Sequence, residues 1–261
     1  MFKIFRQIRY KLMSEKLPVT KTGKTSRYLK YAMGEIILVV IGILIALQIN
    51  NWNEDRKNKI TEANYYCRIL DDFLLNEKLV NENYELISNK IKLTKRLILD
   101  LNTIPNNRSD ILNKFVIALR QDVFVPSTIT FEDLTSSGQL KLLRDIPLKN
   151  RLIKHNTFLN NAVNLLEENR NEIIKRYFDF DLTTELGYQD VDYMRQELGH
   201  ELISFLPKIN WTNDPTNPYF VKFQDNLVFF LGMQMRQRQY YLNLKQELQE
   251  PIKLLKAKNC E

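Results

Sequence analysis

Few side chains in this sequence have the type and spacing that chemistry requires. The two histidines, His155 and His200, are 45 residues apart, and neither belongs to a zinc-binding or catalytic motif. We therefore expect His155 to be an exposed or hydrogen-bonded residue on a helix face. A serine-glycine pair begins at Ser137, but no histidine is near it and the hydrolase elbow pattern is absent. We interpret this pair as a turn.

Two carboxylates, Asp179 and Asp181, are separated by a single residue. On a helix, side chains two positions apart point to different sides, so a shared metal is not expected there. The chain contains no Walker loop, dinucleotide fingerprint, EF-hand or Cys-x-x-Cys pair. The sequence thus predicts no catalytic residue, no metal site and no cofactor, and it indicates that the protein is not an enzyme.

The two cysteines, Cys67 and Cys260, are too few for a disulfide framework. Two unpaired thiols are the simpler interpretation, because Cys260 lies in a tail that is expected to fray. If the C-terminal domain is an up-and-down helical bundle, its last helix runs back toward the early turn that carries Cys67. One disulfide therefore stays open as an alternative.

The longest apolar stretch is YAMGEIILVVIGILIALQI at residues 31–49. Between Ile36 and Ile49 its only polar side chain is Gln48. As a helix, these 19 residues would be about 28 Å long, which is enough to cross the hydrocarbon core of a bilayer. A core helix of a soluble domain is the alternative, but no other window of the chain lacks charge over such a length. We predict a transmembrane helix at residues 31–52.

Basic residues are concentrated before this stretch. Residues 1–30 hold nine basic side chains and one acidic one, which leaves 29 basic and 30 acidic residues in the rest of the chain. This pattern favours a cytoplasmic N-terminus that binds anionic lipid headgroups. The basic charge is explained in this way without a nucleic-acid partner, and none is predicted. No cleavage site follows the apolar stretch, so an uncleaved signal anchor is favoured over a cleaved signal peptide. Arg27, Lys30 and Trp52 are the expected interfacial anchors.

Within the predicted span, Glu35, Gly42 and Ala46 fall on one helical face. Gly42 and Ala46 form a small-xxx-small pair that would let a second helix approach, although such pairs also occur by chance in many spans. Glu35 is expected to reach the inner interface beside the basic anchors. The alternative is a proton- or ion-linked group between subunits.

After the span, the patterns predict helices. Residues 54–101 contain no proline or glycine and form one long amphipathic helix that could continue the span. A shorter helix at 110–122, capped by Ser109 or Asp110, precedes an extended connection. Gly138 should close a short helical piece with a left-handed turn before another begins.

The C-terminal half is predicted to hold two long helices. Pro147 suits the first turn of a helix that runs to about residue 186. The last helix covers residues 219–258, and Pro251 would kink it or end its ordered part. Residues 187–220 between them are the least regular segment, because their prolines exclude a long helix. A loop of this length usually covers a bundle or forms a binding surface.

Two segments resemble a known family. The basic lead-in MFKIFRQIRYKL, the GEI opening of the apolar stretch and its QINNWNE exit resemble the N-terminal signature of the DUF6090 family, membrane-anchored proteins of Bacteroidetes and flavobacteria. The segment FEDLTSSGQLKLLRD, with PLKNR just after it, is similar to a second recurring segment of that family. The resemblance implies a single span, an extracytoplasmic helical domain and no assigned activity. It transfers no catalytic residue to this chain.

These observations predict an all-α protein in four parts. A basic amphipathic segment and linker (1–30) lies in the cytoplasm and leads into the signal-anchor helix (31–52). An extracytoplasmic antiparallel helical bundle (53–258) and a short tail (259–261) follow. The predicted location is a bacterial inner membrane, with the bundle in the periplasm.

The function expected from this organisation is that of a non-enzymatic adaptor or assembly subunit, which presents its bundle to a protein partner or to other copies of itself. One alternative is a periplasmic ligand sensor that passes its signal to another membrane protein, since the short basic N-terminus leaves no room for an output domain. The other is an ion-coupled oligomeric subunit that uses Glu35. A pocket with convergent polar groups would favour the sensor, and a flat apolar patch would favour the adaptor.

Overall fold

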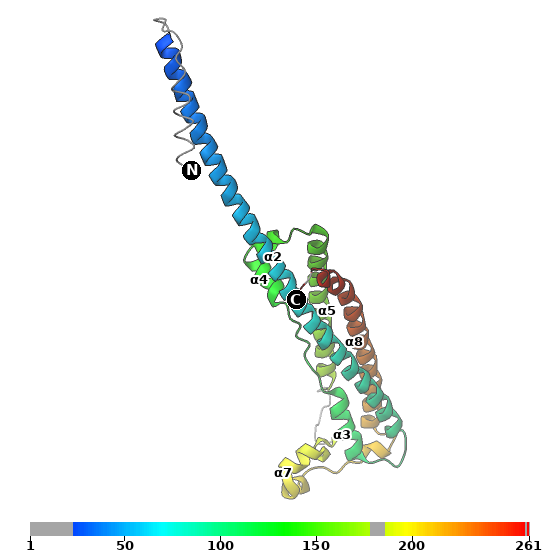
Figure 1. Ribbon diagram of the computed structural model, residues 1–261. Helices are drawn as coiled ribbons and strands as arrows, with labels where there is room; N and C mark the ends of the chain where they lie inside the picture. Colours follow the sequence, from blue (N-terminus) through cyan, green and yellow to red (C-terminus); the bar gives the residue numbers. More distant parts are fainter. Residues whose placement is uncertain (1–22, 178–185, 259, 261) are drawn as a thin grey trace. The chain divides into compact units, whose positions relative to one another are not determined.

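The computed structural model describes residues 23–177, 186–258 and 260, which form helices and contain no strand. The predicted all-α class is confirmed. The α-helices, each labelled in Figure 1, are α2 (Gly23–Leu101), α3 (Arg108–Leu119), α4 (Ile129–Ser136), α5 (Ile146–Tyr177), α7 (Asp192–Ser204) and α8 (Pro218–Lys256). The short 3-10 helices are η1 (Gln139–Leu142), η2 (Tyr188–Asp190) and η3 (Trp211–Asn213).

The chain divides into two compact units, Met1–Lys59 and Ile60–Glu261. We call the second unit the bundle. α2 begins in the first unit and ends in the bundle, so the long helix predicted at 54–101 does continue the apolar stretch. Residues 1–22 and 178–185, which the sequence assigns to the basic segment and to the end of α5, lie outside the described part of the chain.

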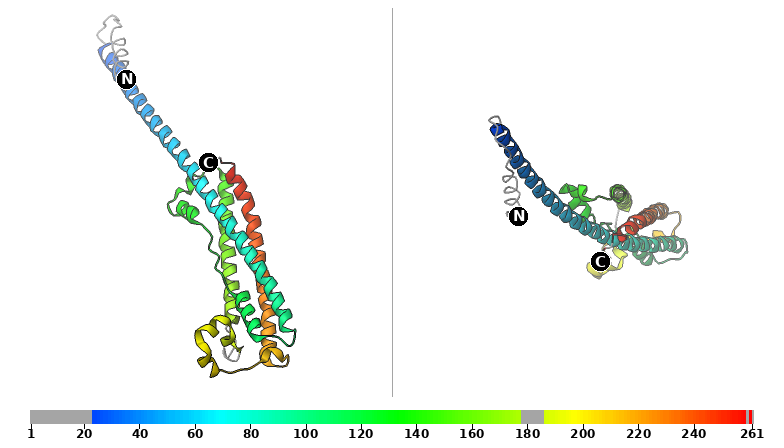
Figure 2. Two further views of the ribbon diagram at one scale, coloured as in Figure 1. Left: turned by 60° about the horizontal axis from the view of Figure 1, so that its bottom comes forward. Right: turned by 45° about the horizontal axis from the view of Figure 1, so that its top comes forward.

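Contacts along the bundle show that α2 and α5 run in the same direction. Just before α5 begins, the backbone N–H of Arg144 donates to Glu62 Oε1 of α2 at 2.6 Å. Further along both helices, the rings of Phe73 and His155 lie 4.4 Å apart. Residue numbers therefore rise together along the two helices, and Figures 1 and 2 show the same arrangement.

α8 runs in the opposite direction to this pair. Its Gln234 accepts a hydrogen bond from Thr94 of α2 at 2.9 Å. Cys260, just beyond the end of α8, is bonded to Cys67 much earlier on α2. Residue numbers on α8 therefore fall as those on α2 rise. The antiparallel packing predicted for the bundle is found where α8 runs against α2 and α5. These two helices are parallel to each other.

A crossover connection, residues 120–145, makes the parallel pair possible. It contains α4 and, as predicted, no helix at 123–128. Asn76 of α2 holds it in place, because Nδ2 donates to Ser127 O at 2.8 Å and Oδ1 accepts from Ser127 N at 2.7 Å. Gly138 has a φ of 67° and makes the predicted left-handed turn after α4. The connection thus returns along the bundle before α5 begins.

The apolar core consists of two clusters. The first includes Tyr65, Ile69, Phe73, Leu148, Leu152, Leu159, Leu244, Leu248 and Leu255. The second, at the end of the bundle that carries α3, includes Leu97, Leu101, Phe115, Ile173, Trp211, Phe223 and Phe230. Each cluster takes side chains from α2, α5 and α8, so the three helices are packed together along the bundle.

A buried polar layer lies between the two clusters. Thr94 and Gln234 are at most 1% exposed, and Thr94 Oγ1 donates to Gln234 Oε1 at 2.9 Å. Gln234 Nε2 donates to the carbonyl of Ala118 on α3 at 3.0 Å. On α5, Asn169 Nδ2 donates to the carbonyl of Met233 at 3.2 Å. These hydrogen bonds connect four helices at one level.

The structure corrects two predictions about these elements. α3 is capped by Asn107, whose side chain accepts from the backbone N–H groups of Ser109 and Asp110, so neither of those residues is the cap. The segment 187–220, predicted to be irregular, contains α7. Gly199 interrupts α7 with a φ of 70°. The segment therefore lacks the regular helical spacing of residues by which a helix is predicted from sequence.

Pro251 lies inside α8, which continues to Lys256, so the proline does not end the helix. Proline has no N–H to donate to the carbonyl of Glu247, four residues earlier. Arg151 of α5 supplies the donor, since its Nη2 lies 3.2 Å from that carbonyl oxygen. The same guanidinium donates to the carboxylates of Glu247 at 2.5 Å and Glu250 at 2.6 Å. α5 thus stabilises a turn of α8 that lacks one of its own hydrogen bonds.

Replacing Arg151 by methionine should lower the free energy of unfolding by about 1–3 kcal/mol, because Glu247 loses its donors. The loss should be smaller when Pro251→Ala is also present, since alanine restores the missing N–H. Urea unfolding of the full chain in detergent, for all four proteins of this double-mutant cycle, measures the coupling. Strictly additive effects would contradict the interpretation. Arg170→Met is the control, because its 3.9 Å ion pair with exposed Glu167 is worth less than about 1 kcal/mol.

Candidate functional site

One helix in the described part of the chain, α2, contains a stretch that is long and apolar enough to cross a membrane. From Ala32 to Trp52 every residue is exposed except Gly34 and Leu38, which are half-buried. No residue of the most apolar window is buried. Soluble monomers rarely leave a continuous apolar surface of this kind uncovered. This stretch is therefore not a core helix of the described structure.

The residues predicted for a span interface lie on one exposed face of this stretch: Glu35, Gly42 and Ala46. A Cβ built on Gly42 would meet no atom within 4 Å, so that face is uncovered in the described structure. Trp52 is exposed, and its role as an interfacial anchor stays a prediction. The side chains of Arg27 and Lys30 lie outside the described part. Self-association through this face and ion coupling through Glu35 stay predictions.

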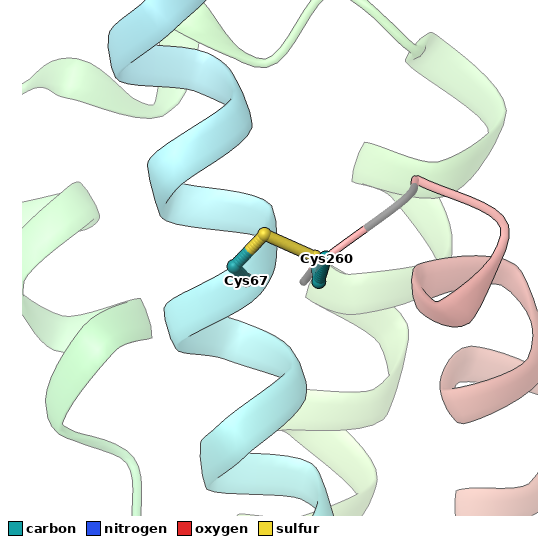
Figure 3. Close-up of a disulfide and its surroundings, with 2 residues drawn as sticks. All are labelled: Cys67 and Cys260. Atoms are coloured by element: carbon teal, nitrogen blue, oxygen red, sulfur yellow. A yellow bond between two sulfur atoms is a disulfide. The ribbon is translucent and has the colours of Figure 1, made fainter.

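A disulfide joins Cys67 of α2 to Cys260, as Figure 3 shows. Their Cα atoms are 5.2 Å apart, and the two residues are separated by 193 positions in the sequence. The interpretation of two unpaired thiols is therefore wrong, and the bridge left open by the sequence is present. The physical reason is that α8 continues through Pro251 and so carries the C-terminal residues back to α2.

Polar contacts hold the end of the chain beside the disulfide. Lys258 Nζ donates to Asp145 Oδ2 at 2.6 Å and lies 5.1 Å from the centre of the Tyr66 ring. The ammonium group lowers the pKa of Asp145, and burial raises the pKa of Tyr66. Cys260 itself packs against the first apolar cluster. The tail at Lys258 and Cys260 is thus fixed rather than frayed.

His155 is 2% exposed, and neither of its ring nitrogens has a hydrogen-bond partner among the described residues. The expectation of an exposed or hydrogen-bonded histidine is therefore wrong. Its Nδ1 lies 3.8 Å from Glu247 Oε1, and its ring packs on Phe73. Burial lowers the pKa of His155 to about 4, an effect that Glu247 opposes and Arg151 reinforces. His155 is a neutral core residue at pH 7.

Local structure accounts for the other candidate residues. Ser137 Oγ donates to the carbonyl of Asp133 at 2.6 Å at the end of α4, which confirms the turn interpretation. His200 is exposed on α7. Asp179 and Asp181 lie outside the described residues, and the described ones contain no group of three side chains that could hold a metal ion.

A cavity of about 350 Å³ lies where α3 begins, at the end of the bundle that also carries α7. Four segments line it: the start of α3, η2, α7 and residues 207–210. We call it the α3–α7 cavity. Its charged lining residues are Arg108, Asp190, Arg195 and Lys208. Amide and hydroxyl side chains supply most of the remaining wall, so polar groups converge on this space.

Hydrogen bonds between these segments fix the walls of the cavity. Arg108 of α3 forms an ion pair with Asp190 of η2. The neighbouring Ser109 Oγ donates to the backbone carbonyl of Asp190 at 2.7 Å. Gln189 Nε2 donates to the carbonyl of Pro207 at 2.9 Å, which ties η2 to the connection after α7. The cavity is therefore preformed and does not depend on a ligand to bring its walls together.

Arg108 is positioned by close contact with Gly187, just before η2. A Cβ on Gly187 would lie 3.0 Å from Arg108 Nε, and Gly187 has a φ of 94°. Both the close approach and the left-handed backbone require glycine at this position. The guanidinium group is thus held between the backbone of Gly187 and the carboxylate of Asp190.

The sequence pattern indicated a covering or binding surface at residues 187–220. It did not identify any of the charged residues that line the cavity. Arg108, Arg195 and Lys208 belong to separate segments and share no motif, and only the return of the chain after α5 brings them together. Comparison with protein-family models, with curated proteins and with solved structures finds no match for this chain.

Acidification should destabilise the bundle through His155. Its pKa is about 4 in the folded protein, below its ordinary value of 6.5. The unfolded chain therefore binds the proton more strongly than the folded protein does. The contribution of neutral His155 to the free energy of unfolding is complete above about pH 6.5 and is lost as the pH falls toward 4. In urea unfolding, His155→Leu should lose less stability than the wild type between those pH values, and His200→Gln should behave like the wild type. Equal losses in all three proteins would contradict this assignment.

Proposed function

We propose that this protein is a single-pass protein of a bacterial inner membrane, anchored by residues 31–52, with its N-terminus in the cytoplasm and its bundle in the periplasm. We propose that its role is non-enzymatic and that the bundle is presented to a protein partner as an adaptor or assembly subunit. Membership of the DUF6090 family is part of the same proposal. The observation that carries it is the uncovered apolar surface of α2.

The uncovered apolar surface of α2 would be costly in water, which favours a membrane anchor. Eleven large apolar side chains between Met33 and Ile49 are exposed. Leaving a side chain of this size in water costs about 1.5–3 kcal/mol relative to burial, so the whole stretch would cost roughly 15–30 kcal/mol. This exceeds the net stability of a typical domain. Lipid removes the cost, and the length of the stretch matches one bilayer crossing.

The disulfide supports the side of the membrane that we propose for the bundle. Disulfides form and persist in the periplasm and outside cells, and they are rare in the reducing cytoplasm. The bond between Cys67 and Cys260 lies within the bundle. The basic residues before the span favour the same orientation, because cationic segments stay on the cytoplasmic side.

One face of α8 supports the role as an adaptor. Val221, Val228 and Met235 are 57%, 58% and 48% exposed and follow one another at seven-residue spacing. Side chains at this spacing line up along one face of a helix. A partner helix packs its own apolar face against a row of this kind. Gly232, within the same exposed row, adds no side chain that would hold a partner away.

A second candidate function is that of a ligand sensor, which the α3–α7 cavity favours. Its volume of about 350 Å³ lies within the range of small-molecule sites. Its polar side chains converge from segments that are distant in the sequence. In this role the bundle would bind a solute in the periplasm and pass the signal to another membrane protein.

The proposed topology makes measurable predictions about the full chain. A reporter enzyme that is active only outside the cytoplasm should be active when fused after Glu261, and the protein should stay in the membrane fraction after alkaline extraction. Cys67 and Cys260 should resist a maleimide reagent until a reductant is added, because the periplasm keeps them bonded. Deletion of residues 31–49 should release the chain from membranes. A reporter active only in the cytoplasm, or a soluble full-length chain, would exclude the proposal.

The adaptor role predicts a partner that binds through α8. Affinity purification of the full chain from solubilised membranes, followed by mass spectrometry, should recover a reproducible neighbour or a second copy of the chain. Val228→Glu should remove most of it, because the charge must be desolvated in an apolar contact. Gln239→Glu, an exposed substitution on the same helix, should retain it. Equal recovery with both variants would exclude this face of α8.

A further inference from the structure

The α3–α7 cavity has an excess of positive charge. Among its described lining residues, Arg108, Arg195 and Lys208 are cationic, and Asp190 is the carboxylate. Arg108 pairs with Asp190. No carboxylate of the described chain lies within ion-pair distance of Arg195 or Lys208, and Arg195 instead donates to Ser109 Oγ at 3.1 Å. Two positive charges therefore face the cavity without compensation.

Arg108 also has an unused hydrogen-bond donor. Its side chain is 13% exposed, and Nη1 is buried without an acceptor among the described residues. Nη1 is closed to solvent, so Arg108 acts on a ligand through its positive charge, and a guanidinium group is a strong partner for an oxyanion. Arg108 is also the first residue of α3, and the N-terminal end of a helix favours negative charge. These features select an anion.

The size and the apolar part of the wall indicate an organic anion. A single inorganic oxyanion would fill only a part of a cavity of about 350 Å³. The cations come from three segments, α3, α7 and the connection that carries Lys208, so they can bind two separate anionic groups. Ile203 and Pro207 add apolar surface to the lining, which suits a short carbon skeleton.

We propose that the α3–α7 cavity is a binding site for a small organic dianion, either a dicarboxylate or an organic phosphate, held by Arg108, Arg195 and Lys208. Arg108 supplies a fixed positive charge in the wall, with its position set by Asp190 and Gly187. Arg195 and Lys208 are exposed lining residues that neutralise the remaining charge. This inference names the ligand class of the sensor that is our second candidate function, and it is independent of the membrane anchor.

Isothermal titration of the full chain in detergent tests the proposal at fixed ionic strength. The probes are succinate as a dicarboxylate, glycerol 3-phosphate as an organic phosphate, inorganic phosphate, and succinamide as the uncharged counterpart of succinate. We expect saturable binding with one site for succinate or glycerol 3-phosphate, and the tighter of the two identifies the anionic group. Inorganic phosphate should bind more weakly, and succinamide should not bind.

Lys208→Glu is the decisive variant, because Lys208 is exposed and has no hydrogen bond or ion pair to another described residue, so its replacement leaves the fold intact. It should weaken binding at least about tenfold, since a charge-assisted contact is lost and a repulsion is added. Lys154→Glu, the same charge change at an exposed position on α5, should leave the dissociation constant within about twofold. Absence of saturable organic dianion binding, equal binding of succinamide, or an unchanged constant in Lys208→Glu would overturn the proposal. None of these results bears on membrane anchoring, which extraction tests separately.

Discussion

The hydrogen bonds of Gln234 join α8 to α2 and α3 in one buried layer, and the arrangement of the bundle depends on them. The side chain accepts from Thr94 and donates to the carbonyl of Ala118, and all of these groups are shielded from water. A shift of α8 by one turn would move Gln234 away from both of its partners. Such a shift would leave a buried amide without partners, which costs more than the hydrogen bonds themselves contribute. The polar layer therefore selects one register.

That register determines what the two ends of α8 meet. Toward its C-terminus, Arg151 reaches the carbonyl that Pro251 leaves without a donor, and Cys260 arrives beside Cys67. Toward its N-terminus, Phe223 and Phe230 complete the second apolar cluster and pack against Phe115 of α3. The disulfide and the cavity are thus consequences of the same placement, although they lie at opposite ends of the bundle.

The helices could be predicted from the sequence because their signals are local, whereas the sites could not. The left-handed turn at Gly138 and the uninterrupted pattern after the apolar stretch depend on neighbouring residues alone. The disulfide depends on the antiparallel return of α8, which no local pattern specifies, and His155 has no nearby residue that marks it as buried. α7 was missed because Gly199 breaks its period. The cationic residues of the cavity lie on separate segments, and only the crossover topology gathers them.

The covalent link between α2 and the residue beyond α8 has a mechanical consequence. A pull applied to the carboxyl end of the chain passes across the sulfur atoms of Cys260 and Cys67 directly into α2. α8 therefore carries little of the load and does not peel from the bundle, and α5 and the crossover connection lie outside the loaded path. Since α2 is one uninterrupted helix from Gly23 to Leu101, tension from a tethered neighbour would travel along its backbone toward the apolar stretch without unfolding the domain.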